Sequence, residues 1–284
     1  MSEIGAAHPN EPVAFDRDDK IRFPRVIVGG LPVAVLDRDR TARLTIGAAM
    51  ARRGSGRPCL FFTTVNGQVV SLCASSADVR RLFLDADVIS PDGMSVVLAS
   101  RLHSRTLPER VATTDAFHDA ARVACGTGAT FYFLGATEEV NALAAERASA
   151  LHPGLRIVGR RNGYFGPDDV STVVEDINAA APDVLWIGLG VPGQQRFVIQ
   201  NRHRLTAVGV AKSCGGLFDF LAGRAKRAPD WMQTAGLEWA YRAYLEPKRL
   251  AWRYLTTNPH AFYHLLASSR GDAKDGAIEA SAIV

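Results

Sequence analysis

Short apolar segments alternate with longer amphipathic segments along the middle of this 284-residue chain. The apolar segments have the length of buried strands, and the segments between them repeat apolar residues with helical spacing. The predicted strands are 59–65, 131–135, 155–159, 183–190 and 206–211, and the predicted helices are 39–52, 76–84, 137–150, 168–180 and 193–203. This alternation predicts an α/β fold, in which a mostly parallel sheet has helices on both faces. Ligands bind such sheets beyond the C-terminal ends of the strands, so the residues just after each strand are candidate site residues.

Changes in composition divide the chain into four parts. Residues 1–23 and 268–284 are small or polar without a pattern and are predicted to be flexible tails. Residues 24–220 form the predicted Rossmann-like α/β domain, which opens with a hairpin over 25–37 about a Gly-Gly turn. Residues 221–267 are rich in Arg and aromatic residues and are predicted to form a helical, membrane-binding appendage.

The composition is that of a soluble globular protein, with 47% hydrophobic and 22% charged residues. A net charge of +4 is too small to predict nucleic-acid binding. Four widely spaced cysteines without a CxxC pair favour a reducing cytosol over a disulfide framework or a zinc ribbon. The N-terminus lacks a signal-peptide pattern, and no apolar stretch is long enough to span a bilayer. We therefore expect a cytoplasmic protein that meets the membrane peripherally, at its inner face.

Asp92 lies in a Pro-Asp-Gly turn that opens a helix near Gly93. An aspartate in this position can simply cap the helix, because its carboxylate accepts the first free amide hydrogens. A carboxylate at the mouth of the sheet is also a candidate general base that would deprotonate an acceptor hydroxyl. The residues alone leave both interpretations open.

Three further polar residues lie at or next to the ends of predicted elements. Thr64 and Asn66 lie at the C-terminal end of the strand 59–65, where a hydroxyl and an amide can bind a sugar or a nucleotide, although a polar strand end is usually only a turn. Arg110 lies in a loop before a helix that begins near Thr114. Such an arginine is most often solvated, but beside a diphosphate its planar fork can neutralise the charge of a leaving group.

Two glycine-rich turns follow the last two predicted strands. The string GLGVPGQQRF (188–197) formally contains GxGxxG, but Pro192 interrupts the turn and no acidic residue ends the next strand, which argues against a dinucleotide site. The helix start beside Gly190 and Gln194 can still bind a phosphate. At Gly215 and Gly216 the absence of side chains would let a ligand approach the backbone, although close packing of a helix on a strand explains these glycines equally well.

No pattern in the sequence predicts a metal site. DxD strings occur at 16–18, 37–39 and 85–87, in a tail, a loop and a helix end. Because the pattern occurs three times in such places, it does not identify a metal-binding site. His260 and His264 are four residues apart without the Glu of HExxH, and are expected to be packed. We therefore expect no metal and no other cofactor, with Arg residues and helix dipoles stabilising the charge instead.

A set of short strings, taken in order, resembles the WecG/TagA/CpsF family of glycosyltransferases over roughly residues 25–266. The strings are TVN (64–66), ADVISPDG (86–93), ERV (109–111), FLGA (133–136), GYF (163–165), PDVLWIGLGVPGQQ (182–195), GGLFDFLAGRAKRAPDW (215–231) and GLEWAYRAYLEPKRLAWRYL (236–255). The resemblance implies an inverting, metal-independent transfer from a UDP-sugar, typically UDP-N-acetylmannosamine or a related sugar, to an acceptor linked to undecaprenyl diphosphate. Such a reaction builds polysaccharides of the bacterial cell surface.

The resemblance also implies roles for individual residues. Asp92 matches the proposed catalytic base, and Thr64, Asn66, Arg110 and Gln194 match residues that line the nucleotide-sugar pocket. On the arguments from the residues themselves, Arg110 is the second catalytic candidate, because it can stabilise the leaving group. The predicted substrate-binding residues also include Gly135, Gly190, Gly215 and Gly216. Arg242, Arg249 and Arg253 match basic positions that would complete the active site and contact the membrane. Departures from the pattern at Thr114, Gln195 and Trp252 leave the donor sugar open.

Two other functional classes remain as alternatives at this point. One is an NAD-dependent nucleotide-sugar epimerase or dehydrogenase, and the other is a non-enzymatic basic adaptor for membranes or nucleic acid. The expected partners are a UDP-sugar, an undecaprenyl-diphosphate-linked acceptor and an anionic membrane surface, without nucleic acid. A homo-oligomer is possible, and the acceptor glycan and the pathway stay open.

Overall fold

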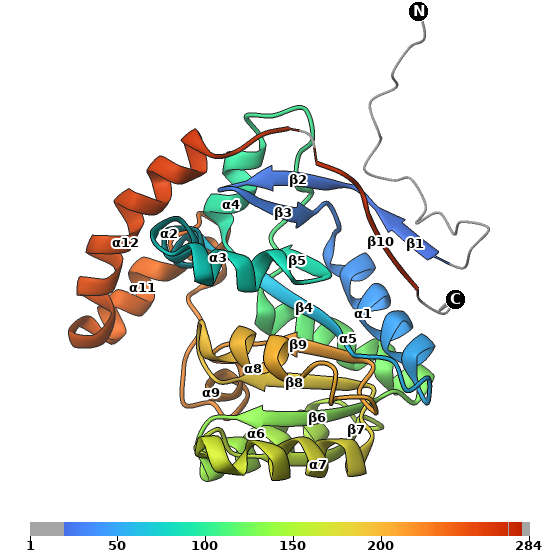
Figure 1. Ribbon diagram of the computed structural model, residues 1–284. Helices are drawn as coiled ribbons and strands as arrows, with labels where there is room; N and C mark the ends of the chain where they lie inside the picture. Colours follow the sequence, from blue (N-terminus) through green and yellow to red (C-terminus); the bar gives the residue numbers. More distant parts are fainter. Residues whose placement is uncertain (1–19, 272, 280–284) are drawn as a thin grey trace, which may run out of the picture.

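A six-stranded sheet forms the centre of the structure, a computed structural model that describes residues 20–271 and 273–279 (Figure 1). The strand order is β5-β4-β9-β8-β6-β7, and every neighbouring pair is parallel. The strands are β4 (Leu60–Val65), β5 (Val88–Pro91), β6 (Thr130–Gly135), β7 (Arg156–Arg161), β8 (Val184–Gly188) and β9 (Val210–Ser213). The predicted parallel sheet is confirmed.

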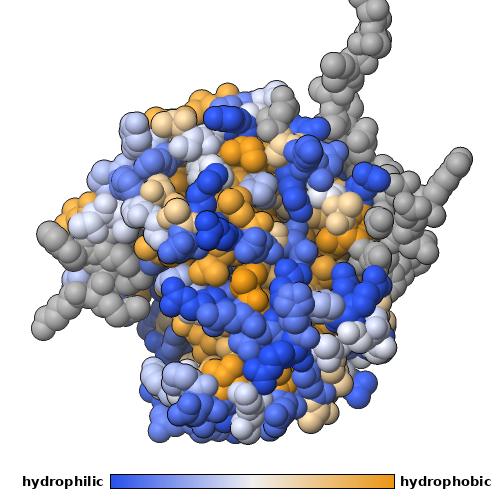
Figure 2. All heavy atoms as spheres, in the orientation of Figure 1, coloured by the Kyte–Doolittle hydropathy of each residue, from blue (hydrophilic) through white to orange (hydrophobic). Residues whose placement is uncertain are grey.

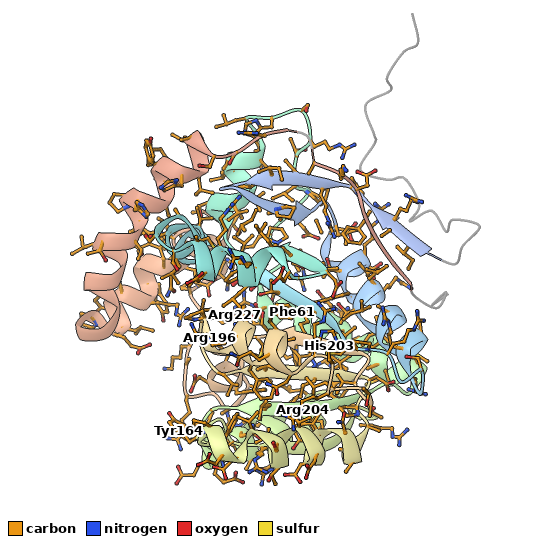
Figure 3. All side chains as sticks on the ribbon, in the orientation of Figure 1. Phe61, Tyr164, Arg196, His203, Arg204 and Arg227 are labelled. Atoms are coloured by element: carbon orange, nitrogen blue, oxygen red, sulfur yellow. The ribbon has the colours of Figure 1, made fainter. Side chains whose placement is uncertain are left out.

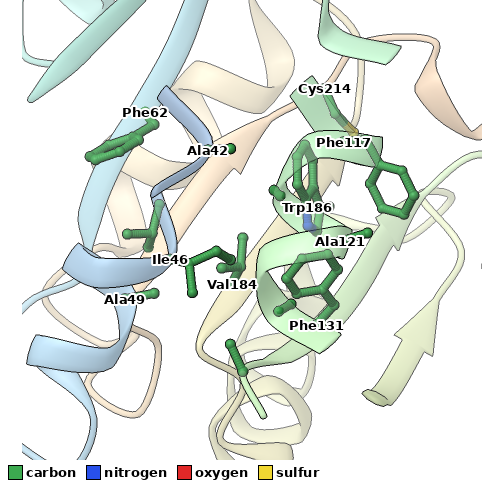
Figure 4. Packing of buried hydrophobic residues seen from close by; sticks show 14 of the residues in the cluster. Ala42, Ile46, Ala49, Phe62, Phe117, Ala121, Phe131, Val184, Trp186 and Cys214 are labelled. Carbon is green, nitrogen blue, oxygen red and sulfur yellow. The ribbon is translucent and has the colours of Figure 1, made fainter. Parts of the chain in front are cut away.

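Helices cover both faces of this sheet, because successive side chains of each strand point to opposite faces. Phe62 and Trp186 belong to the buried cluster on one face, whereas Phe61 and Leu185 belong to the cluster on the other. The helices on the first face are α1 (Arg38–Arg52), α5 (Thr113–Thr127), α6 (Glu138–Leu151) and α9 (Leu217–Leu221). Those on the second face are α7 (Val170–Ala180) and α8 (Gly193–Asn201). A short 3-10 turn, Pro167–Asp169, comes directly before α7. Figure 4 shows Phe117 of α5 against Trp186, with ring centroids 5.1 Å apart and an edge-to-face geometry.

A third cluster lies beyond the β5 edge of the sheet, under the predicted hairpin. The hairpin consists of β2 (Arg25–Val28) and β3 (Leu31–Ala34), and Gly29 and Gly30 between them have positive φ angles of 57° and 76°. Two positive φ angles are what a tight two-residue hairpin turn requires. The hairpin packs on α2 (Gly67–Ser75), α3 (Ala77–Leu84) and α4 (Met94–Ser100). Of these, α2 is not among the predicted helices.

The structure differs from the prediction of two flexible tails. Lys20–Phe23 form β1, which pairs antiparallel with β10 (Gly276–Glu279). Ile21, Phe23 and Ile278 are buried against the main cluster, and this burial stabilises the pair. Residues 1–19 and 280–284 of the predicted tails lie outside the described residues.

The strand predicted over 206–211 lies further along the chain, because β9 runs from Val210 to Ser213. The preceding Gly209 passes so close to α1 that an added Cβ would lie 2.3 Å from the carbonyl oxygen of Ala49. Pairing with β4 and β8 begins at Val210, just after this close approach.

The predicted appendage is helical and lies over the C-terminal ends of the strands (Figure 1). It contains α10 (Asp230–Thr234), α11 (Glu238–Leu245) and α12 (Pro247–Ala267). His260 of α12 shares a 2.9 Å hydrogen bond with Ser71 of α2, so the long helix is tied to the sheet domain. Within the described residues, no helix combines the length and the apolar composition needed to cross a bilayer.

One buried cation stands out in the core. Lys212 of β9 is 1% exposed, and its Nζ has no hydrogen-bond partner among the described residues. The ammonium lies 5.9 Å from the centroid of the Trp186 ring. Burial lowers the pKa of Lys212 from 10.5 to about 8. Because the folded protein binds this proton less tightly than the unfolded chain, charging the lysine costs stability below about pH 8, and the cost diminishes between about pH 8 and 10.5.

We expect the substitution Lys212→Met to raise the free energy of unfolding by about 1–3 kcal/mol at neutral pH, because it removes a buried charge and keeps the apolar stem. The gain should shrink at about pH 9.5, where the wild-type lysine is neutral in the folded state. Urea unfolding at the two pH values measures both effects. The exposed Lys226→Met is the control and should change stability by less than about 0.5 kcal/mol. A gain that does not depend on pH would contradict this account.

The sheet is closely packed where β6 passes β8. Gly135 has a φ angle of 139°, and an added Cβ would lie 2.4 Å from the carbonyl oxygen of Gly188 on the neighbouring strand. Only glycine fits this position without moving backbone.

Gly135→Ala should therefore lower the free energy of unfolding by about 2 kcal/mol or more, through both the backbone strain and the clash. Gly193→Ala is the matched control, because a Cβ there would meet no atom within 4 Å. Thermal unfolding of both variants distinguishes the two sites. Equal stability of the two variants would show that the contact between β6 and β8 is looser than described.

Candidate active site

A cavity of about 1280 Å³ opens at the C-terminal edge of the sheet, between the strand ends and the appendage. It is larger than most small-molecule pockets and has room for a nucleotide and a sugar. Nine of the predicted site residues line it: Thr64, Asn66, Asp92, Arg110, Gly190, Gln194, Gly215, Gly216 and Arg242. Residues that are far apart in sequence therefore meet in one place, as the parallel topology predicts.

Asp92 is positioned by the parallel pairing of β4 with β5. Its backbone N–H donates to the carbonyl of Val65, which ends β4, over 2.8 Å. Its Oδ1 accepts a 3.0 Å hydrogen bond from the N–H of Thr113, the first residue of α5. The carboxylate thus satisfies one free donor at a helix start, as an N-capping side chain would. The Asp92 side chain is partly buried and lines the cavity, so capping does not exclude a role with a ligand.

Burial is the largest influence on the ionisation of Asp92 and raises the pKa of its carboxyl above the usual value. The positive charge of Arg110 and the hydrogen bonds from Thr113 and Asn66 oppose this rise. The negative charge of Glu238 adds to it. A carboxyl with a raised pKa beside a cavity is a stronger proton acceptor than an ordinary aspartate, as general-base catalysis requires.

Arg110 lies against Asp92 in the loop before α5. Its Nε donates to the carbonyl oxygen of Asp92 over 2.9 Å, and its Nη2 donates to Oε2 of Glu238 over 2.5 Å. Both side chains of this ion pair are largely buried, with 14% of Arg110 and 18% of Glu238 exposed. The pair joins the sheet domain to the first residue of α11.

Asn66 and Thr64 come from β4 and the turn after it. The Oδ1 of Asn66 accepts a 3.1 Å hydrogen bond from the N–H of Val69, so Asn66 caps α2. An added Cβ at Gly93 would lie 3.0 Å from the Cβ of Asn66, which shows how closely the turns after β4 and β5 approach each other. Thr64 is partly exposed to the same cavity.

The glycine-rich turns after β8 and β9 form another wall of the cavity. Gly190 and Gly215 have positive φ angles of 73° and 52°, and an added Cβ at either would meet no atom within 4 Å. The space in front of both backbones is therefore open. The Oε1 of the buried Gln194 accepts a 3.1 Å hydrogen bond from the N–H of Gly215, so this side chain joins the two turns.

Three predicted residues are not placed in the cavity wall. Gly135 lies behind it, against the cavity-lining Gly188. Arg249 and Arg253 belong to α12, and their side chains lie outside the described residues. Arg242 does line the cavity, with its guanidinium 5.6 Å from the centroid of the Phe220 ring.

Sequence reasoning missed several residues that line the cavity, above all Glu238. An acidic residue at the first position of a predicted helix in a basic segment was the available signal, since carboxylates favour helix starts. Tyr164 was also missed as an individual residue; Figure 3 shows it beside the strand ends, on the same side of the molecule as Arg227. Arg227 pairs with Asp115 of α5 and holds the base of the appendage.

In the part of the chain that the structure describes, no group of three or more His, Cys, Asp and Glu side chains could hold an ion. His260 and His264 share a 3.2 Å hydrogen bond between their Nε2 atoms, on the face of α12 that packs on α2. His260 therefore lies at the contact between α12 and α2, and His264 is hydrogen-bonded to it.

Comparison with known proteins agrees with this geometry. Residues 26–275 match the model of the glycosyl transferase WecG/TagA/CpsF family. A relative in Bacillus subtilis (strain 168) is 33% identical over 69% of this chain and 75% of its own, and one in Bacillus spizizenii is 33% identical over 75% and 81%. A third, in Staphylococcus aureus (strain MRSA252), is 28% identical over 67% of this chain and 74% of its own. All three are named N-acetylglucosaminyldiphosphoundecaprenol N-acetyl-beta-D-mannosaminyltransferase.

The match covers the sheet, the cavity and the whole appendage, and it distinguishes between the functional classes that the sequence left open. The matched family and the named relatives are glycosyltransferases rather than epimerases, dehydrogenases or adaptors. This chain belongs to the WecG/TagA/CpsF family and is a glycosyltransferase.

Proposed function

We propose that this enzyme transfers a sugar, N-acetylmannosamine or a related hexose, from a UDP-sugar to a glycan linked to polyprenyl diphosphate, with inversion at the anomeric carbon. The observation that carries the proposal is the pairing of Asp92 with Arg110 at one edge of a nucleotide-sized cavity. The names of the relatives support the lipid-linked acceptor and the aminosugar. The product would extend a polysaccharide of the cell surface.

In the proposed reaction, Asp92 takes the proton of the acceptor hydroxyl. Its Oδ1 already accepts from Thr113, so Oδ2 is the oxygen expected to act as the base. The acceptor oxygen attacks the anomeric carbon, and the bond from that carbon to the UDP oxygen breaks on the opposite face. UDP leaves with the bonding electron pair and gains negative charge, which Arg110 stabilises.

We expect Asp92→Asn to lower turnover by about 10²–10⁴-fold, because an amide cannot take the proton. The assay is the release of UDP from a panel of UDP-sugars in the presence of a lipid-diphosphate acceptor, with the exposed Asp78→Asn as the control. UDP should still bind the variant, which calorimetry can check. Wild-type turnover in Asp92→Asn would remove Asp92 from the mechanism. Failure of every UDP-sugar with the wild-type enzyme would overturn the proposed donor class.

The same assay addresses the proposed absence of a metal requirement. Arg110, rather than a cation, is proposed to balance the charge of the departing diphosphate. Turnover should then persist in excess EDTA. A loss that Mg²⁺ or Mn²⁺ restores would refute this part of the proposal.

The appendage is proposed to dock on the inner face of the cytoplasmic membrane. Its helices expose large apolar side chains: Trp231, Trp239, Tyr244, Leu245, Leu255, Phe262, Tyr263 and Leu266. By contrast, the face drawn in Figure 2 is mostly hydrophilic over the sheet domain, and its apolar residues form small separate patches. Phe262 and Trp239 also line the cavity, so a lipid-linked acceptor could reach Asp92 from the docked side. Exposed aromatic residues of this kind suit the bilayer interface.

The double substitution of Trp231 and Tyr244 by Ser should weaken binding to vesicles with anionic lipid by about tenfold or more, because these side chains are 66% and 82% exposed and free to enter the interface. Leu151→Ser is the control, since Leu151 is 62% exposed and is the last residue of α6, at the other end of that helix from Glu139, which lies near Arg224 of the appendage. Vesicle sedimentation measures the binding. Substitution is preferable to deletion, because Leu265 of α12 and Ile278 of β10 are buried in the fold. Unchanged binding of the double variant would contradict the proposed docking.

A further inference from the structure

Glu238 lies where the appendage meets the catalytic edge of the sheet. It is the first residue of α11, and it lines the cavity that also contains Asp92 and Arg110. Elsewhere the appendage is tied to the sheet domain by Arg227 with Asp115 and by His260 with Ser71. Unlike these contacts, the ion pair of Glu238 with Arg110 lies in the cavity wall. A movement of α11 would therefore directly affect the position of Arg110 beside Asp92.

The two hydrogen bonds of Arg110 fix the orientation of its guanidinium plane. Nε donates to the backbone of Asp92 and Nη2 donates to Glu238, so the fork is held at two points. A guanidinium has five N–H donors in a rigid plane. Nη1 has no hydrogen-bond partner among the described residues, which leaves its two N–H groups and the second one of Nη2 available to an anion in the cavity.

We propose that Glu238 is a positioning residue, which holds the Arg110 guanidinium so that its free N–H groups face the diphosphate of the donor. The idea rests on the proposed function of Arg110. The ion pair of Glu238 with Arg110 couples the position of α11 to the chemistry. When α11 moves away from the cavity wall, Arg110 loses one of its two hydrogen-bond partners, and its guanidinium is no longer held in one orientation. Misplacement of a charge-stabilising group by about 1 Å can cost about 100-fold in rate.

The negative charge of Glu238 has a second effect, on Asp92. The charged groups that act on Asp92 are Arg110 from the loop before α5, Glu238 from α11 and Lys212 from β9. Glu238 repels the ionised form of Asp92 and so contributes to the raised pKa of that carboxyl. Replacing Glu238 by a neutral residue removes this repulsion, so the pKa of Asp92 should fall.

The test uses Glu238→Gln in the full-length enzyme, with vesicles of anionic lipid present in the activity assay. Turnover should fall about 10- to 100-fold, because Arg110 is no longer directed at the diphosphate. The affinity for UDP should change less than turnover, because a weaker contact with Arg110 and the removal of an anion from the cavity act in opposite directions. The acid limb of the pH–rate profile should move to lower pH, following the pKa of Asp92. Glu238→Asp, which keeps the charge, should leave the acid limb closer to that of the wild type.

Glu175→Gln on the exposed surface of α7 is the matched control and should change none of these quantities. Wild-type turnover in Glu238→Gln would overturn the proposal, and so would a loss of turnover with an unmoved acid limb. Titration of the Asp92 carboxyl by NMR in the free protein needs no substrate. It therefore tests the influence of Glu238 even if no UDP-sugar proves to be a donor, and an unchanged Asp92 pKa in Glu238→Gln would contradict the inference.

Discussion

The parallel pairing of β4 with β5 is the constraint on which the site depends. It places the turn after β4, with Asn66, beside the turn after β5, with Asp92, and the 2.8 Å hydrogen bond from Asp92 to Val65 fixes their relative height. The first residue of α5, Thr113, then donates to the carboxylate, and Arg110 in the loop before α5 donates to the backbone of Asp92. Each of these contacts is local, but only the sheet brings the contributing segments together. The geometry of the candidate site is therefore a consequence of strand order and direction.

The electrostatics of the cavity follow from how these charges are buried. A buried carboxylate is costly, and the N–H of Thr113, the amide of Asn66 and the charge of Arg110 offset that cost only in part, because the pKa of Asp92 remains raised. Glu238 adds negative charge to the same region and at the same time anchors Arg110. The appendage thus contributes both to the direction of the cation and to the basicity of the carboxylate. That dual effect explains why a helical segment far along the chain can matter to a site built on strand ends.

Sequence reasoning predicted the parts of this molecule that depend on local patterns. The alternation of apolar and amphipathic segments predicted the parallel sheet, and residues such as Asp92, Asn66 and Gln194 were found because they follow strands. The pairing of β1 with β10 was missed, since each strand is short and its partner lies at the other end of the chain. Glu238 was missed because its importance comes from a tertiary contact with Arg110. Gly135 was assigned to substrate binding, whereas its evident constraint is close packing against Gly188.

A crystal structure of the enzyme with an intact UDP-sugar tests the central claim most directly, because the claim is about which groups face the reacting carbon. The account predicts that the diphosphate lies within hydrogen-bond distance of the Arg110 Nη atoms. It also predicts that the Asp92 carboxylate faces the side of the anomeric carbon opposite to the UDP oxygen, with space between them for an acceptor hydroxyl. A donor bound with its anomeric carbon turned away from Asp92, or with its diphosphate out of reach of Arg110, would contradict it.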